Sequence, residues 1–170
     1  MKKIILAISM LFIGYISFAQ SAWIRVALDE KVSVMMPGAP QKNQTPQSVV
    51  FMLKTTDSSV YNVNVIDFAG FGMDSAMLQG MVGEESFLEQ FKTGFVQQMG
   101  DAEVIESKMS NFGKYTVYEF TIEIAGEGAV KRRLHNYNLF VGSKDYSFTF
   151  SATSNEEALK DKFLKSIEVN

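Results

Sequence analysis

The residues best suited to chemistry lie in one short segment, VKRRLHNYNL, at positions 130–139. It holds the densest positive charge of the chain and its only histidine. Lysine and arginine bind anions, and a histidine can act as a general base near neutral pH. If the segment is a strand, alternate side chains share one face of a sheet. The members of that face are Lys131, Arg133, His135 and Tyr137.

The strand expected before this segment carries acids that balance these bases. Glu119, Thr121 and Glu123 share one face of YTVYEFTIEI, and the glycine-rich AGEGA joins the two segments as a hairpin loop. If Glu123 pairs with Lys131, then Glu119 pairs with His135, and acids lie opposite bases. Such pairs contribute about 0.2–1 kcal/mol each. We therefore interpret the face as solvated and charge-balanced, with an anion or partner-docking patch as the alternative.

Catalysis by His135 is a further alternative. No nucleophile signature such as G-x-S-x-G occurs in the chain. An enzyme would require His135 to lie in an apolar cavity and to touch a serine or an acid. We predict no catalytic residue, and the competing hypothesis is a hydrolase-type enzyme that uses His135 as its general base.

Phe68 and Phe71, beside Gly70 and Gly72, form a second candidate contact surface. Their segment follows an expected strand and precedes a helix, as a dinucleotide-binding turn does. Ser75, however, stands where the third glycine of that motif belongs. We therefore predict a plain strand-to-helix turn whose two aromatic rings either form an exposed contact point or tuck under the helix.

The composition excludes several classes of site and partner. One histidine and no cysteine leave too few ligands for the usual zinc sites, and no calcium-loop spacing occurs. Glu84, Glu85 and Glu89 lie near an expected helix start, where negative charge is favoured anyway. The absence of cysteine also excludes a disulfide scaffold. We predict no metal and no cofactor.

The first residues predict export. Two lysines precede an uncharged stretch at 4–20, and Ser17 and Ala19 supply the small side chains of a signal-peptide cleavage site. Residues 1–19 are then the signal peptide and residues 20–170 a single exported domain, periplasmic or secreted. No later stretch is apolar enough to span a membrane. Loss of the two lysines shifts the formal net charge from −3 to −5, with 14 basic and 19 acidic residues left. An acidic exported domain is a poor nucleic-acid binder.

Hydrophobic periodicity predicts the scaffold. Alternating patterns and short connections predict strands at 32–37, 48–55, 60–68, 103–109, 115–124, 130–141 and 145–152. A helical stripe at Met77, Met81, Leu88, Phe91, Phe95 and Met99 predicts a helix over 74–99. The polar, proline-containing segment 38–47 predicts a surface loop, and a capping box of Ser154 with Glu157 predicts the start of a final helix. The fold class is α+β, a mainly antiparallel β-sheet covered by two helices.

This layout resembles the PsbP-like superfamily. The resemblance lies in a tryptophan-containing lead-in, a short strand that runs into MPGAP, a mid-chain helix, an antiparallel meander and a closing FLKSI helix. It spans most of Trp23 to Ile167. It implies an α/β/α sandwich, and a protein that docks on larger assemblies rather than catalysing a reaction.

The sequence therefore predicts an exported, non-enzymatic binding or assembly-accessory domain of the bacterial cell envelope. Its partner is an envelope protein or a small ligand, and its candidate binding residues are Lys131, Arg133, His135, Tyr137, Phe68 and Phe71. The alternatives are the hydrolase described above and a purely structural subunit of an envelope complex.

Overall fold

The computed structural model describes residues 23–97, 99–100, 102–125 and 131–170, so the predicted signal peptide and most of the AGEGA loop lie outside the described ranges. The elements in chain order are β1 (Ile24–Ala27), β2 (Val32–Met36), β3 (Gln41–Gln44), β4 (Ser48–Lys54), β5 (Val60–Asp67), the 3-10 helix η1 (Phe68–Phe71), α2 (Ser75–Met81), α3 (Glu85–Gln97), β6 (Glu103–Phe112), β7 (Tyr115–Ala125), β8 (Lys131–Val141), β9 (Lys144–Ser151), α4 (Glu156–Leu164) and β10 (Glu168–Val169). All strand pairs among the described residues are antiparallel, as predicted.

Seven strands form one large sheet in the order β3-β4-β5-β9-β8-β7-β6, and β1, β2 and β10 form a small one. Alternation decides which face of the large sheet is apolar. In β5 the buried Tyr61, Val63 and Val65 alternate with half-buried asparagines. In the β5–β9 ladder these three residues pair with Phe150, Phe148 and Tyr146, respectively. The hydrophobic alternation of the sequence therefore becomes a continuous apolar face.

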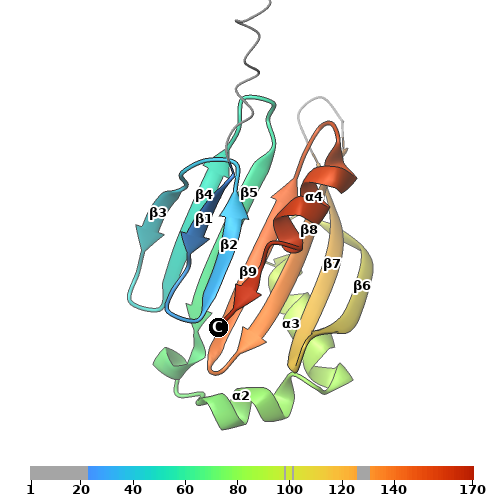
Figure 1. Ribbon diagram of the computed structural model, residues 1–170. Coiled ribbons are helices and arrows are strands. Elements are labelled where there is room, and N and C mark those ends of the chain that lie inside the picture. The colour runs from blue at the N-terminus through green and yellow to red at the C-terminus, as the bar shows by residue number, and fades with distance from the viewer. Residues whose placement is uncertain (1–22, 98, 101, 126–130) are drawn as a thin grey trace, which may run out of the picture.

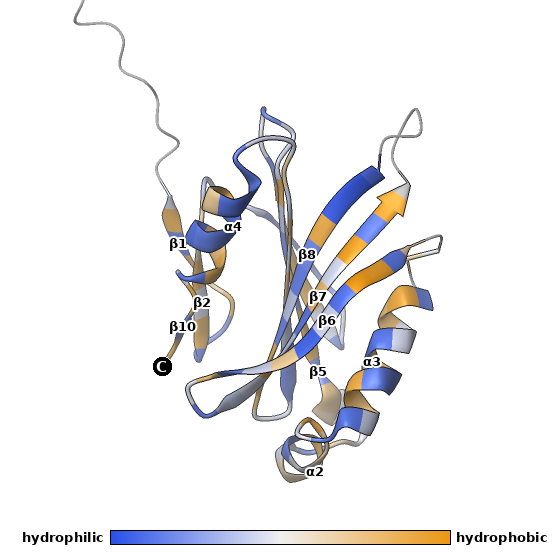
Figure 2. Ribbon diagram, turned by 90° about the vertical axis from the view of Figure 1, so that its right-hand side faces the viewer, coloured by the Kyte–Doolittle hydropathy of each residue, from blue (hydrophilic) through white to orange (hydrophobic). Residues whose placement is uncertain are grey.

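The large sheet separates two layers of structure (Figure 1). The small sheet and α4 lie against one of its faces, and α3 lies against the other, with α2 at one end of the sheet (Figure 2). The first core includes Val34, Phe148 and Phe163, and the second includes Leu88 and Phe140. The α+β class and the antiparallel strands are confirmed. The detail of one sheet covered by two helices is not, because the described ranges hold three α-helices and a second sheet.

The helix predicted over 74–99 is divided into α2 and α3. In α2 only Leu78 is buried, whereas Met77 is 53% and Met81 36% exposed. The predicted apolar stripe was therefore wrong for these two methionines, because α2 crosses the end of the sheet rather than its face. The stripe holds in α3, where Leu88 is buried. No helix in the described ranges combines the length and the apolar character of a membrane span.

Two local predictions were wrong. The expected loop at 38–47 contains β3, whose four exposed residues pair with β4 at the edge of the large sheet. An edge strand needs no apolar face, so hydrophobic periodicity does not reveal it. The expected capping box at Ser154 does not form. The N-cap of α4 is Asn155, with φ 51°, ψ 30° and no side-chain capping bond.

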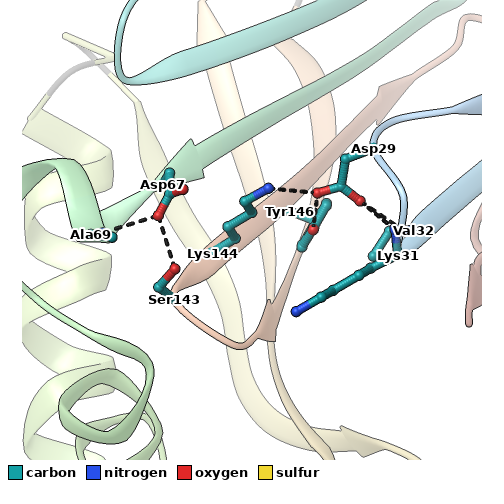
Figure 3. Close-up of polar contacts among 8 residues, drawn as sticks. All are labelled: Asp29, Lys31, Val32, Asp67, Ala69, Ser143, Lys144 and Tyr146. Carbon is teal, nitrogen blue, oxygen red and sulfur yellow. Dashed lines mark hydrogen bonds and ion pairs between the residues drawn. The ribbon is translucent and has the colours of Figure 1, made fainter.

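Two aspartates connect the β8–β9 turn and the start of β9 to segments far away in the sequence (Figure 3). Asp67 accepts hydrogen bonds from Ser143 Oγ at 2.9 Å and from the backbone N–H of Ala69 at 3.0 Å. Asp29, in the turn before β2, accepts hydrogen bonds from Lys144 Nζ at 2.8 Å and from the Tyr146 hydroxyl. The Asp29 contacts hold the small sheet against the end of β9.

Candidate binding groove

The register of β7 and β8 decides which side chains of the candidate segment meet. Thr121 lies opposite His135, Glu123 opposite Arg133, Glu119 opposite Tyr137 and Ala125 opposite Lys131. The prediction that Glu123 pairs with Lys131 and Glu119 with His135 was therefore wrong by two residues. The register is displaced, so that Ala125 and not Glu123 lies opposite Lys131. The predicted charge balance survives as a diagonal contact, because Lys131 Nζ lies 2.8 Å from Glu123 Oε2.

Lys131, Arg133, His135 and Tyr137 share one face of β8, as the alternation predicted, and that face is the one on which α4 packs. Lys131 and Arg133 are exposed, whereas the side chain of His135 is only 15% exposed. His135 Nε2 lies 2.6 Å from Glu156 Oε1, at the start of α4. The prediction that this whole face is solvated was wrong for His135 and Tyr137, because α4 and its neighbours cover the strand progressively toward its C-terminal end.

A groove opens between α4 and the strands β6, β7 and β8. Its cavity volume is about 390 Å³, within the range of small-ligand sites. The strand side is lined by Ile105, Glu106, Lys108, Glu119, Phe120, Thr121, Arg133, His135, Asn136 and Tyr137, and the helix side by Glu157, Lys160 and Leu164. Three of the predicted binding residues thus line one cavity, while Lys131 lies outside its lining.

Two rows of side chains cross the floor of the groove from strand to strand. In the first row Glu106 of β6 pairs with Thr121 of β7, which pairs with His135 of β8. In the second row Lys108 pairs with Glu119, which pairs with Tyr137. Residues in register across adjacent strands lie side by side on the same face. The first row therefore places a carboxylate, a hydroxyl and an imidazole in one line, with Glu156 of α4 at the imidazole end.

Glu119, in the middle of the second row, makes two direct polar contacts. Glu119 accepts a hydrogen bond from Ser110 Oγ at 2.6 Å, and its other carboxylate oxygen lies 3.1 Å from Lys108 Nζ. Partial burial, followed by the negative charge of Glu119, raises the pKa of Tyr137 to about 12. Tyr137 therefore remains a neutral hydroxyl that can donate or accept a hydrogen bond in the groove.

Nearer the hairpin loop, on the same face of β7 and β8, Glu123 forms ion pairs with the exposed Lys131 and Arg133. The hydrogen bond from Lys131, together with the charges of Lys131 and Arg133, lowers the pKa of Glu123. Reciprocally, Glu123 and then Glu103 raise the pKa of Lys131. These bases are thus occupied by carboxylates, and the strand that looks basic in sequence is not a free positive patch.

The second predicted surface divides into a half-buried and an exposed residue. Phe68 packs against the core beneath α3, and its backbone N–H donates to the carbonyl of Ser143 at 2.9 Å. Phe71 is 64% exposed, with ring centroids of the pair 6.4 Å apart. Neither residue lines the groove. The turn is the plain strand-to-helix connection that was predicted, and Asp67 caps η1 by accepting from the N–H of Ala69.

The groove residues that sequence reasoning missed come from α4 and from the edge strand β6. Glu157, Lys160 and Leu164 recur at three- and four-residue intervals, so they lie on one side of the helix. The periodicity of α4 reveals that such a side exists, but not which strands it faces. Among the described residues, no group of three or more His, Asp or Glu side chains is placed to hold a metal ion.

The arrangement can hold a polar ligand in two ways. Carboxylates and bases along both walls offer charge-assisted hydrogen bonds, and Tyr137 and Leu164 offer apolar surface. His135 is held by Glu156 through Nε2, while Nδ1 has no hydrogen bond within the described ranges. A histidine held by a carboxylate is also found where a histidine acts as a general base.

Comparison with known proteins identifies the class of fold. No protein-family profile and no curated protein sequence matches the chain. Among solved structures, the chain is similar to cyanobacterial PsbP (CyanoP) from Synechocystis sp. PCC 6803, with a TM-score of 0.56 and 16% identity over 91% of this chain and 96% of that one. The fold is therefore PsbP-like, and the resemblance predicted from the sequence is confirmed at the level of fold.

Two further solved structures are more distant. A protein from Bacteroides thetaiotaomicron matches with a TM-score of 0.46 and 9% identity over 82% of this chain and 45% of that one. A protein of unknown function from Pseudomonas aeruginosa matches with a TM-score of 0.46 and 11% identity over 82% of this chain and 88% of that one.

Proposed function

We propose that this protein is an exported, non-enzymatic binding domain of the bacterial cell envelope, and that it takes a small ligand or a short segment of an envelope protein in the groove between α4 and β6–β8. The observation that carries the proposal is the convergence of Arg133, His135 and Tyr137 on one cavity of about 390 Å³. The PsbP-like layout supports it, because that resemblance implies a docking rather than a catalytic role.

Export is the part of the proposal that rests on the leader sequence. Residues 1–19 have the charge, apolar and small-residue order of a secretory signal, with cleavage after Ala19. Expression in a Gram-negative host, followed by fractionation and N-terminal sequencing, tests this. A mature protein that begins at Gln20 in the periplasm or the medium is the expected result, and an uncleaved cytoplasmic protein would contradict it.

Binding in the groove is tested by filling it. Thr121 lies at the centre of the groove floor, and Thr121→Trp replaces a small side chain by a large one. Peptides and polar small molecules are titrated into ¹⁵N-labelled protein, and the amide shifts of β6, β7, β8 and α4 are followed. We expect ligands that shift groove resonances in the wild type to lose this effect in Thr121→Trp. The matched control is Gln41→Trp on the exposed edge strand β3, at the opposite edge of the same sheet.

A hydrolase that uses His135 is the second candidate, and the 2.6 Å contact between His135 Nε2 and Glu156 Oε1 favours it. The lining of the cavity favours binding instead, because six of its 13 residues are charged, whereas the enzyme hypothesis requires an apolar cavity around His135. Ester, amide and glycoside panels decide between the two. A turnover that both His135→Ala and Glu156→Gln abolish would establish the enzyme, whereas turnover that survives both variants, or is absent, supports the binding domain.

A further inference from the structure

The groove contains bases, yet each of them already has an acidic partner. Lys108 Nζ lies 3.1 Å from Glu119, Lys160 Nζ lies 2.7 Å from Glu157, and Arg133 lies 3.7 Å from Glu123. An anionic ligand would have to displace these carboxylates or lie against them. Either event costs free energy, because like charges repel and a separated ion pair must be resolvated.

Glu106 is different from the other acids of the lining. Within the described ranges it is the one lining carboxylate that forms neither an ion pair nor a hydrogen bond, and it is exposed on the edge strand β6. A β-bulge at Ile105 directly precedes it. A bulge re-aims the neighbouring side chains of a strand and is frequent beside binding sites. Glu106 thus brings an uncompensated negative charge to one wall of the cavity.

The register sets the backbone separation of Glu106 and His135 across the groove floor. Glu106, Thr121 and His135 stand in one row on three adjacent strands, so the outer two are separated by two strand spacings, about 9.6 Å. Thr121 is the smallest side chain of the row. The space above it therefore lies between the free carboxylate of Glu106 and the imidazole that Glu156 holds.

We propose that the groove recognises a cationic group, a guanidinium or an alkylammonium on a short apolar stem, in the space above Thr121 with Glu106 as its counter-ion. This inference rests on the proposed function, because it names the ligand chemistry of the same groove. The stem lies along Tyr137 and Leu164, whose apolar surfaces line the cavity. An arginine or lysine side chain of a partner protein has this chemistry, and so has a free amine of similar length.

Three matched probes test the charge preference. Nα-acetyl-arginine amide carries the cation, Nα-acetyl-citrulline amide is its neutral isostere, and Nα-acetyl-glutamate amide carries the opposite charge. Each is titrated into the ¹⁵N-labelled protein at low and high NaCl. We expect the arginine compound to shift groove amides with at least about fivefold higher affinity than the other two, and added salt to reduce the difference.

Two carboxylate variants test whether Glu106 causes the preference for the arginine compound. Glu106→Gln should abolish the advantage of the arginine compound over citrulline. Glu103→Gln, on the same strand but outside the cavity lining, should leave it unchanged. A five-residue peptide with one central arginine then separates the two sources of the ligand, since tighter binding than the single amino acid indicates a protein segment and equal binding indicates a free amine.

The outcomes for this inference differ from those for the groove itself. If the citrulline or glutamate compound binds the groove as tightly as the arginine compound, the cation preference is overturned while binding in the groove stands. If the arginine compound keeps its advantage in Glu106→Gln, the assignment of Glu106 is overturned. If no probe and no member of the wider panel shifts groove resonances, both proposals fail.

Discussion

Asp29 accepts a hydrogen bond from Lys144 Nζ at 2.8 Å although the two residues are 115 positions apart in the sequence. The same carboxylate accepts from the Tyr146 hydroxyl and from the backbone N–H groups of Lys31 and Val32. Partial burial acts to raise the pKa of Asp29, but these hydrogen bonds outweigh it and lower the pKa to about 2. The folded state therefore favours the charged carboxylate of Asp29. Its hydrogen bonds to Lys144 and Tyr146 connect the small sheet to the large one.

Asp29→Asn should destabilise the domain. The pKa of the Asp29 carboxyl is ordinarily 3.8 and falls to about 2 in the folded state. The charged carboxylate therefore stabilises the fold fully at pH values above 3.8, and this stabilisation is lost as pH falls toward 2. Urea unfolding at pH 7 should show a loss of about 1–3 kcal/mol for the variant, and the loss should shrink at acidic pH. Glu30→Gln is the matched control, because Glu30 is exposed and has no hydrogen bond or ion pair in the described ranges. Equal effects of the two variants would contradict the assignment.

Phe68→Ala and Phe71→Ala should differ strongly although the residues are three apart. Phe68 packs against the core beneath α3, so its truncation leaves a space and should cost about 1–3 kcal/mol. Phe71 is 64% exposed, and its truncation should change stability by less than about 0.5 kcal/mol. Thermal and urea unfolding of both variants measure this. A comparable loss for Phe71→Ala would show that its ring is more deeply packed than the structure indicates.

The strand faces were predictable from the sequence, whereas the groove was not. Alternation in β8 depends only on neighbouring residues, so the shared face of Arg133, His135 and Tyr137 follows from spacing alone. The cover of that face comes from α4, where Glu156 meets His135 across 21 positions. No local signal specifies which strand a helix will face. The sequence therefore predicts the strand and the face of the candidate site, but not the helix that covers it.

The register of the β7–β8 hairpin was misjudged for a related reason. The glycine-rich loop indicates a turn but does not fix which residues face each other across it, and Ala125 lies opposite Lys131. As a result, the β7 residues opposite Lys131 and His135 are shifted by two positions. A shift of two keeps every side chain on the same face of the sheet but changes its partner. The charge balance was thus predictable, and the identity of the pairs was not.

The start of α4 provides a direct test of a wrong local prediction. Asn155 is the N-cap in a left-handed conformation, φ 51°, and Ser154 is exposed without a capping bond. Asn155→Ala should cost about 1 kcal/mol, because a Cβ-bearing residue other than Asn or Asp is disfavoured there, whereas Asn155→Gly should be neutral or slightly stabilising. Ser154→Ala should change stability by less than about 0.5 kcal/mol. If Ser154→Ala instead lowers the free energy of unfolding by about 1 kcal/mol, the result would indicate that Ser154 caps α4 in the wild type.

Asp145 of β9 is the most deeply buried acid of the described ranges, 1% exposed, and its Oδ1 has no hydrogen-bond partner there. It pairs in register with Ile66 on one side and Phe140 on the other. Burial raises the pKa of Asp145 well above its ordinary value of 3.8. The carboxyl group is therefore protonated in the folded protein under conditions in which the unfolded chain has released the proton.

The sign of the resulting pH dependence is opposite to that of Asp29. Because the pKa of Asp145 is raised in the folded state, the protonated group stabilises the fold fully at pH values below 3.8. This stabilisation is lost as pH rises toward the folded pKa. Asp145→Asn keeps the shape of the side chain and removes the titration. As pH rises above 3.8, the free energy of unfolding of the wild type should therefore fall relative to that of Asp145→Asn, by up to about 1.4 kcal/mol per pH unit, until the folded pKa is reached. Urea unfolding of both proteins at several pH values measures the difference, and parallel curves across this range would show that Asp145 is already ionised in the fold.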